Sequence, residues 1–279
     1  MLVRVPVANV WTKPVEGYEL ALSEQGLMKE WTESLTLEGR MQLWKENVLQ
    51  TQVLLGDEVE IVKEEGDWAE VRVLSQSSSK DKKGYPGWMY KGQLREGNLQ
   101  GERFVITVPE AELFDEEERE KQRIVYQTVL PLVKEEGDWV FLMTPDGLRK
   151  TKRENGAAGA DLLTNGKQFI GLPYLWGGTS AFGYDCSGFT YTLARSVGVD
   201  IPRDAHDQAK AGEAVERADM QPGDLLFFAY ENGKGAIHHV AVYAGEGQML
   251  HAPKTGKCIE VIPIEGIYAE ELCAIRRVI

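Results

Sequence analysis

The sequence predicts an α+β protein in which two small β-barrels precede a larger mixed domain. Two observations carry this prediction. A short stretch of strand and turn residues at 62–69 recurs almost unchanged at 133–140. After residue 155, a glycine-rich turn, one amphipathic helical segment and several apolar strand-like segments follow one another. Such an order is typical of an α+β domain. We expect domains at 1–98, 99–152 and 153–279.

The repeated stretch reads VKEEGDWA in the first copy and VKEEGDWV in the second. In each copy an alternating apolar segment runs into a Glu-Gly-Asp turn, and a second apolar segment begins at tryptophan, which is typical of a β-hairpin. An internal repeat of this kind predicts the same architecture twice. Residues 19–49 are expected to form a helical insertion in the first barrel. The small-residue segment 152–160 marks the entry to the third domain.

Composition limits the classes of protein to consider. The chain has 279 residues, 43% of them hydrophobic and 27% charged, as expected of a globular protein of two or three domains. A net charge of −13 disfavours nucleic acid and other polyanions as partners. Three cysteines do not suggest a disulfide scaffold. Residues 1–17 hold no stretch long enough for a signal peptide or a membrane span, so a cytoplasmic location is expected, with secretion as the alternative if a leader was removed.

Cys186 is the first candidate for chemistry. It lies between the turn YLWGG at 174–178 and a segment, 187–199, that carries Phe189, Leu193 and Val197 on one helical face. The sequence therefore predicts a helix with Cys186 at its first turn. There the positive end of the helix dipole lowers the pKa of a thiol, as a nucleophilic cysteine requires.

Histidines follow on two predicted strands, 237–245 and 249–253. Strand alternation predicts that the neighbours His238 and His239 point to opposite faces, so that only one of them faces the cysteine. A Cys-His pair with a third polar group that orients the imidazole is the general layout of cysteine peptidases. Cys186, His239 and His251 supply such a set in chain order.

The motifs YLWGG, DCSGF, GDLLFF, HVAVYAG and MLHAP occur in this order, and together they resemble the NlpC/P60 cell-wall peptidases, which are papain-like cysteine hydrolases. The resemblance covers about residues 155–279. It implies that Cys186 is the nucleophile, His239 the base and His251 the orienting residue. The two barrels resemble the bacterial SH3 domains that often accompany such enzymes. The fold class is then a papain-like NlpC/P60 catalytic domain preceded by two SH3-like β-barrels.

The resemblance also implies a substrate. Relatives cleave the γ-D-glutamyl bond to a diamino acid in peptidoglycan stem peptides, and the tandem barrels resemble those of members that recycle free muropeptides with a free N-terminal L-Ala. Relatives of this type bind the amine with a barrel tyrosine and an acidic residue. Here these become Tyr85, in a predicted turn at 84–88, and Gln50, unless Glu46 supplies the acid. Further candidates for substrate binding near the nucleophile are Tyr174, Trp176, Asp185, Ser187 and His238.

Other interpretations stay open at this point. Cys186, His239 and His251 are acceptable zinc ligands, although their spacing matches no common zinc motif. The barrels could bind wall peptides or a partner while the third domain supports them. A thioester intermediate could also pass its acyl group to an amine, as in an acyltransferase. No cofactor is expected, and neither is a membrane partner. We expect a monomer.

Several residues have structural interpretations as well. Tyr85, Tyr174 and Trp176 could be core aromatics. Cys258 and Cys273 are expected to act as small hydrophobic residues. His206 is expected at the surface or behind the site. Relatives often carry serine where this chain has Ala205, so one polar contact to substrate is expected to be missing or replaced.

Overall fold

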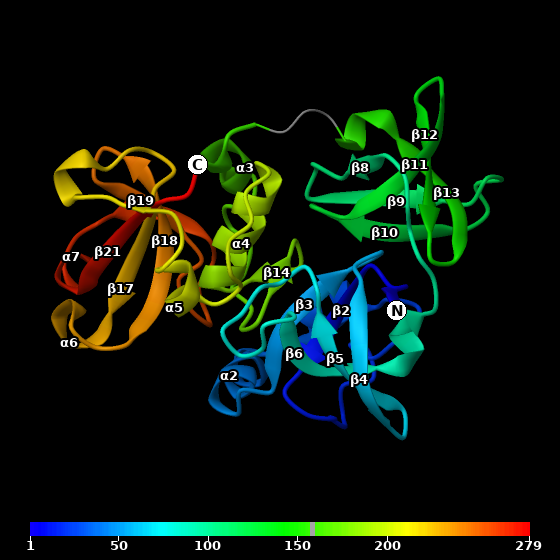
Figure 1. The fold of residues 1–279 in the computed structure, drawn as a ribbon, viewed down its shortest axis with the longest axis horizontal. Coiled ribbons are helices and arrows are strands. Elements are labelled where there is room, and N and C mark those ends of the chain that lie inside the picture. Colours follow the sequence, from blue (N-terminus) through cyan, green and yellow to red (C-terminus); the bar gives the residue numbers. More distant parts are fainter. Residues whose placement is uncertain (157–159) are drawn as a thin grey trace. The chain divides into compact units, whose positions relative to one another are not determined.

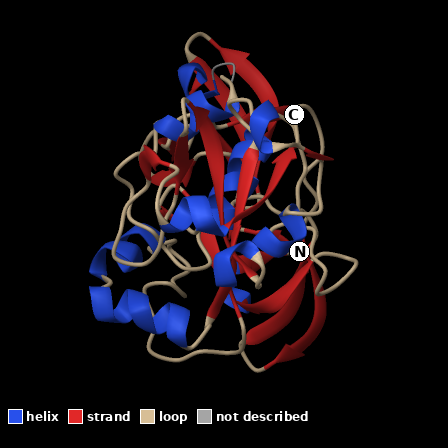
Figure 2. Cartoon of the chain, turned by 90° about the vertical axis from the view of Figure 1, so that its left-hand side faces the viewer, coloured by secondary structure: helices blue, strands red, loops and turns tan. Residues whose placement is uncertain are grey.

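The computed structural model describes residues 1–156 and 160–279, and the chain divides into two compact units. The first unit comprises Met1–Ser75, Lys83–Ala158 and Ser180–Phe182; the second comprises Gln76–Lys82, Gly159–Thr179 and Gly183–Ile279. Strands predominate in the regular structure, and the helices are short (Figure 2). Within the described residues, no helix combines the length and the apolar character that crossing a membrane would require.

The first barrel is a five-stranded antiparallel sheet in the order β3-β2-β6-β5-β4 (Figure 1). Its strands are β2 (Val7–Trp11), β3 (Leu49–Leu54), β4 (Val59–Glu65), β5 (Trp68–Val73) and β6 (Tyr85–Tyr90). A separate two-stranded sheet pairs β1 (Leu2–Val3) with β7 (Leu94–Arg95), which precede and follow the five strands in the sequence. The apolar face of the sheet is buried, with Val10, Val53, Val71 and Met89 fully inside.

The helical insertion lies between β2 and β3, and it is shorter than the sequence predicted. It consists of α1 (Met28–Ser34) and α2 (Leu37–Lys45), while residues 19–27 form turns. Thr36 caps α2 by accepting a hydrogen bond from the Gly39 amide. The ring of Trp31 packs edge-on against Trp11 of β2 at 6.0 Å, so the insertion extends the core of the first barrel.

The second barrel is a six-stranded sheet in the order β10-β9-β13-β12-β11-β8. The strands are β8 (Arg103–Val105), β9 (Glu110–Phe114), β10 (Lys121–Val125), β11 (Val129–Glu136), β12 (Trp139–Thr144) and β13 (Gly147–Lys152). Leu113, Ile124, Leu130 and Val140 form its core. Leu2 joins this core, so the two barrels of the first unit share one apolar cluster.

The repeated sequence forms a repeated hairpin, as predicted. Glu65 pairs with Trp68 in the first barrel and Glu136 with Trp139 in the second, so Gly-Asp makes each tight turn. Gly66 and Gly137 have left-handed φ angles of 56° and 59°, which glycine adopts without strain. Both hairpins also contain a register shift at the first valine of the repeat, Val62 and Val133, so the repeat includes the bulge.

The second unit is built on a six-stranded antiparallel sheet in the order β16-β21-β17-β18-β19-β20. The strands are β16 (Glu213–Ala214), β17 (Leu225–Ala229), β18 (Ile237–Gly245), β19 (Gln248–His251), β20 (Glu260–Pro263) and β21 (Leu272–Arg277). Of these, β18 and β19 correspond to the strands predicted at 237–245 and 249–253. The helices are α3 (Leu162–Lys167), α4 (Cys186–Ser196), α5 (Ala205–Gln208), α6 (Tyr230–Gly233) and α7 (Ile267–Glu271). A small hairpin, β14 (Thr179–Ser180) with β15 (Gly183–Tyr184), precedes α4.

Helix α4 carries the first candidate residue and packs with α3 beside the sheet (Figure 1). Its apolar side chains Phe189 and Leu193 are buried, as the helical pattern predicted. The helix ends at Ser196 and not at residue 199, because Gly198 adopts a left-handed φ of 78° and turns the chain away.

Candidate active site

The start of α4 is fixed by backbone packing and by a cap. Asp185 is the N-cap residue, and its Oδ1 accepts a hydrogen bond of 2.6 Å from the Gly188 amide. A Cβ atom on Gly188 would overlap the carbonyl oxygen of Gly178, so this close approach of two backbones requires glycine. The glycines of the YLWGG and DCSGF motifs therefore place Cys186 at the first turn of the helix.

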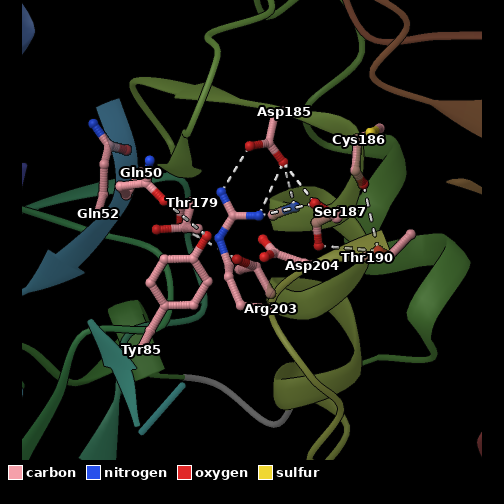
Figure 3. A network of polar contacts seen from close by, with 12 residues as sticks. Gln50, Gln52, Tyr85, Thr179, Asp185, Cys186, Ser187, Thr190, Arg203 and Asp204 are labelled. Atoms are coloured by element: carbon pink, nitrogen blue, oxygen red, sulfur yellow. Dashed lines mark hydrogen bonds and ion pairs between the residues drawn. The ribbon is translucent and has the colours of Figure 1, made fainter. Parts of the chain in front are cut away.

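A buried polar network surrounds this turn (Figure 3). The guanidinium of Arg203 donates to both carboxylate oxygens of Asp185, at 3.2 and 2.7 Å, and to Ser187 Oγ at 2.9 Å. Arg203 is only 1% exposed, so this ion pair is almost fully removed from water. Such a bidentate pair fixes the geometry of both partners. The sequence analysis assigned Asp185 and Ser187 to substrate binding and did not single out Arg203.

A second set of contacts anchors the chain before α5 to α4. Gln208 Nε2 donates to the carbonyls of Ser187 and Pro202, each at 2.9 Å. Its Oε1 accepts from Thr190 Oγ1 at 2.7 Å. Gln208 is buried and was also missed by sequence reasoning. Together with Arg203, it holds the segment 202–208 against the start of the helix.

The two adjacent histidines of β18 do not alternate as predicted. Phe228 of β17 pairs with His239 and Ala229 pairs with Ile237, which leaves His238 as the extra residue of a β-bulge. The imidazole rings of His238 and His239 lie 6.5 Å apart with only 24° between their planes. The expectation that they point to opposite faces was wrong, because the bulge interrupts the alternation at this position.

His239 and His251 form a direct pair. The Nε2 atom of His239 lies 2.9 Å from Nδ1 of His251, and the rings meet edge to face. This contact leaves Nδ1 as the His239 nitrogen that can serve the thiol. The amide of Val240, the residue after His239, acts on the Cys186 thiol as a hydrogen-bond donor, as does the amide of Ser187. The structure therefore brings the three predicted residues into one cluster.

The electrostatics of the cluster differ from the sequence expectation. Burial, followed by the charge of Asp185, raises the pKa of Cys186 to about 12, while the amides of Val240 and Ser187 and the charge of Arg203 act to lower it. Burial, followed by the neighbouring His251 and His238, lowers the pKa of His239 well below its usual value. Each group is therefore neutral when taken alone. Transfer of one proton from the thiol to the imidazole would create both charges together.

Burial also lowers the pKa of His251, from 6.5 to about 4. A histidine that is buried neutral stabilises the folded state above its unfolded pKa, and this stability is lost as the pH falls from 6.5 toward 4. We expect His251 to contribute a loss of about 3 kcal/mol in the free energy of unfolding by pH 4, since one pKa unit is worth about 1.4 kcal/mol. Urea unfolding of wild type and His251→Gln at pH 7 and pH 4 measures it. Equal losses in the two proteins would contradict the assignment.

His238 belongs to a neighbouring cluster. Its Nε2 lies 2.9 Å from a carboxylate oxygen of Glu271, and the ring of Tyr230 stacks on it at 4.1 Å. Tyr230 is 56% exposed and opens α6, in which Glu231 and Asn232 both have left-handed φ angles. Two such residues in succession are costly and need support from their surroundings. The stacked rings of Tyr230 and His238 form an aromatic surface beside His239.

The remaining candidates of the second unit lie at different depths. Tyr174 is buried, and burial, followed by the charges of Cys186 and Asp185, raises its pKa well above the usual value. Trp176 is partly exposed. His206 of α5 is half-exposed and approaches Asp207 at 3.3 Å, in agreement with the expected surface position. Its neighbour Ala205 opens the same short helix.

In the first unit, Tyr85 is not in a turn. It is the first residue of β6, pairs with Val73 of β5 and is 1% exposed in the barrel core. The predicted turn was wrong because Gly84, at φ 151°, lets the chain pass close to the Val73 carbonyl and enter the strand directly. The Tyr85 hydroxyl lies 3.4 Å from Gln50 Oε1, and Gln50 Nε2 donates to Thr12 Oγ1.

Two further sequence interpretations concern the cysteines and a metal. Cys258 and Cys273 are exposed and not buried, so the expectation of small core residues was wrong.

Among residues 1–156 and 160–279, no group of three or more His, Cys, Asp or Glu side chains is placed to hold a metal ion. The zinc interpretation of Cys186, His239 and His251 therefore has no donor set in this part of the chain.

Comparison with known proteins agrees with this geometry. Residues 171–277 match the NlpC/P60 family and residues 106–155 match the YKFC SH3b2 domain. A gamma-D-glutamyl-L-lysine dipeptidyl-peptidase of Bacillus subtilis (strain 168) is 45% identical over 97% of this chain and 96% of its own length. Its namesake from Bacillus cereus (strain ATCC 10987 / NRS 248) is 39% identical over 98% and 89%.

A solved structure shows the same likeness along the whole chain. The crystal structure of an NlpC/P60 family protein from Bacillus cereus ATCC 10987 superposes with a TM-score of 0.95 at 37% identity, covering 99% of this chain and 98% of that one. The fold class predicted from the sequence, with a catalytic α+β domain after SH3-like barrels, is thereby confirmed. The chain belongs to the NlpC/P60 family of cysteine peptidases.

Proposed function

We propose that this protein hydrolyses the γ-D-glutamyl amide bond that precedes a diamino acid in peptidoglycan stem peptides, and that it releases the N-terminal dipeptide. The observation that carries the proposal is the cluster at the start of α4. Cys186 lies at the first turn of the helix beside the Val240 amide, and the next residue back, His239, is paired with His251 at 2.9 Å. Two relatives that match nearly the whole chain are named for this reaction.

The chemistry follows from the neutral resting pair. As the Cys186 sulfur attacks the carbonyl carbon of the γ-amide, its proton passes to Nδ1 of His239. The amides of Ser187 and Val240, which already face the sulfur, are the donors nearest to the oxyanion that forms. The imidazolium then gives its proton to the leaving amine, the C–N bond breaks and a thioester remains. Water, deprotonated by His239, hydrolyses the thioester and restores the thiol.

The position of the acid defines where the leaving group lies. His239 has to reach the nitrogen of the departing diamino acid, so this part of the substrate lies on the histidine side of the sulfur. His238 and the exposed ring of Tyr230 are next to His239 there, at the bulge. We assign them to the leaving diamino acid, and Tyr174, Trp176, Asp185 and Ser187 to the acyl side. Tyr85 and Gln50 stay the sequence-based candidates for the substrate amine.

The test is cleavage of defined peptides. We expect L-Ala-γ-D-Glu-L-Lys and L-Ala-γ-D-Glu-diaminopimelate to yield L-Ala-γ-D-Glu in mass spectrometry, while the α-linked isomer of either stays intact. An N-acetylated peptide serves as the control for recognition of the free amine. No cleavage of any γ-linked peptide would contradict the proposal.

The same assay separates the alternatives. A binding protein would bind the peptides and leave them whole. An acyltransferase would transfer L-Ala-γ-D-Glu to an added amine such as hydroxylamine or glycine in preference to water, so the ratio of adduct to free dipeptide distinguishes it from a hydrolase. For a hydrolase we expect the free dipeptide as the main product.

We also propose a domain organisation, a location and an oligomeric state for this protein. The domain limits 1–98, 99–152 and 153–279, the cytoplasmic location and the monomeric state are predictions for separate experiments. The two peptides of the assay compare L-lysine and diaminopimelate directly as the diamino acid.

A further inference from the structure

One nitrogen of the catalytic cluster has no hydrogen bond among the described residues. His251 is fully buried, at 0% exposure, and its Nδ1 faces His239. Its other nitrogen, Nε2, is buried with no hydrogen-bond partner. A buried polar atom of this kind is costly unless a nearby group satisfies it when the site is at work.

The nearest charged group to this nitrogen is a carboxylate on the adjacent strand. The register of β19 and β20 sets His251 directly opposite Glu260, so their side chains are cross-strand neighbours. Glu260 Oε1 lies 3.7 Å from His251 Nε2, just beyond hydrogen-bond range. The Glu260 side chain is 42% exposed and therefore free to move toward the ring. Catalytic hydrogen bonds are often long in an empty site and shorten when substrate is bound.

We propose that Glu260 is a positioning residue that holds His251 in the tautomer its role requires. When His239 is protonated, its Nε2–H donates to Nδ1 of His251, so Nδ1 has to carry the lone pair. The proton of the neutral His251 ring is then on Nε2, the atom that faces Glu260. A carboxylate at this position stabilises that tautomer and disfavours the one with the proton on Nδ1, which would set two N–H groups against each other.

The other groups around His251 do not fill this role. The ring of Tyr268, from α7, packs on His251 at 5.5 Å and on His239 at 6.0 Å, but these are contacts between rings and not hydrogen bonds to the imidazole nitrogen. The second carboxylate of this region, Glu271, is engaged with His238 at 2.9 Å. Charges of both Glu260 and Glu271 reach the Tyr268 hydroxyl and, after burial, raise its pKa. Glu271 therefore contacts His238, and Glu260 is the carboxylate next to His251.

The inference rests on the proposed function for its kinetic part, so the test combines a spectroscopic and a kinetic measurement. In 15N-labelled wild type, long-range 1H–15N spectra are expected to show His251 protonated on Nε2. In Glu260→Ala we expect a mixture of tautomers or protonation on Nδ1. Glu260→Gln should keep the Nε2–H form, because its amide oxygen still accepts a hydrogen bond. Glu265→Gln, an exposed glutamate in the turn before α7, is the matched control for the loss of charge.

The change in kcat is expected to follow the change in the His251 tautomer. On L-Ala-γ-D-Glu-L-Lys, Glu260→Ala should lower kcat by about tenfold or more with little change in KM, as for other partners of catalytic histidines. Glu260→Gln should recover most of this loss, and Glu265→Gln should match wild type. An unchanged His251 tautomer in Glu260→Ala would overturn the proposal, as would unchanged kcat. If wild type does not cleave the peptide, the spectra still decide the role of Glu260 and only the proposed function fails.

Discussion

Cys186→Ala is expected to lower kcat/KM on the γ-linked peptides by about 10⁴-fold or more, because removal of a nucleophile leaves only binding and oxyanion stabilisation. The fold should persist. Alanine occupies the first turn of α4 without strain, and the cap between Asp185 and the Gly188 amide does not involve the sulfur. Peptide cleavage followed by mass spectrometry measures the loss, and circular dichroism with urea unfolding monitors the fold.

The chain offers matched controls for this substitution. Cys258→Ala and Cys273→Ala remove the same atom from two exposed positions, and both should retain wild-type cleavage. Residual hydrolysis near the wild-type rate in a folded Cys186→Ala protein would exclude the thiol mechanism. Loss of activity in either control would point to a different sulfur as the nucleophile.

Arg203→Met is expected to lower the free energy of unfolding by about 3–5 kcal/mol, the cost of leaving one partner of a buried ion pair without the other. Asp185 would keep its charge at the start of α4, and Ser187 would lose the donor at 2.9 Å. Activity should fall as well, since the charge of Arg203 acts to lower the pKa of Cys186 and that of Asp185 acts to raise it. Urea unfolding at pH 7 gives the stability change.

Two further variants make this prediction specific. Arg217→Met changes an exposed arginine of the same unit and should alter stability by less than about 0.5 kcal/mol. In the double variant Arg203→Met with Asp185→Asn, no uncompensated charge stays buried, so its loss should be smaller than the sum of the single losses. Additive losses would show that Arg203 stabilises the fold through contacts other than the one with Asp185.

The elements that the sequence predicted well are those that depend on neighbours in the chain. The Glu-Gly-Asp-Trp hairpins form because glycine takes the left-handed turn position and the flanking residues alternate. Helix α4 begins where a capping aspartate meets an apolar periodic segment. The order of Cys186, His239 and His251 could also be read directly, since each lies in a motif of its own.

The elements that the sequence did not predict depend on tertiary packing. The bulge at His238 is a property of the pairing between β17 and β18, which alternation along one strand does not contain. Arg203 meets Asp185 only because the segment before α5 folds back on α4. Only a general argument pointed to a partner such as Arg203, namely that a charged capping residue beside a nucleophile needs a compensating cation. The raised pKa of Cys186 likewise follows from burial, whereas the sequence showed only the helix terminus.

The bulge in β18 also determines how the chain tolerates changes of length. Because His238 is one residue in excess of its partner strand, deletion of a single residue there would give a regular ladder and a well-formed sheet. The same deletion would leave His239 opposite Phe228, and so beside His251, but it would remove the imidazole that meets Glu271 and stacks on Tyr230. Insertions and deletions are usually harmless in loops and harmful in strands because they threaten folding. At this position a shortened strand would keep the contact between His239 and His251 and lose the cluster built on His238.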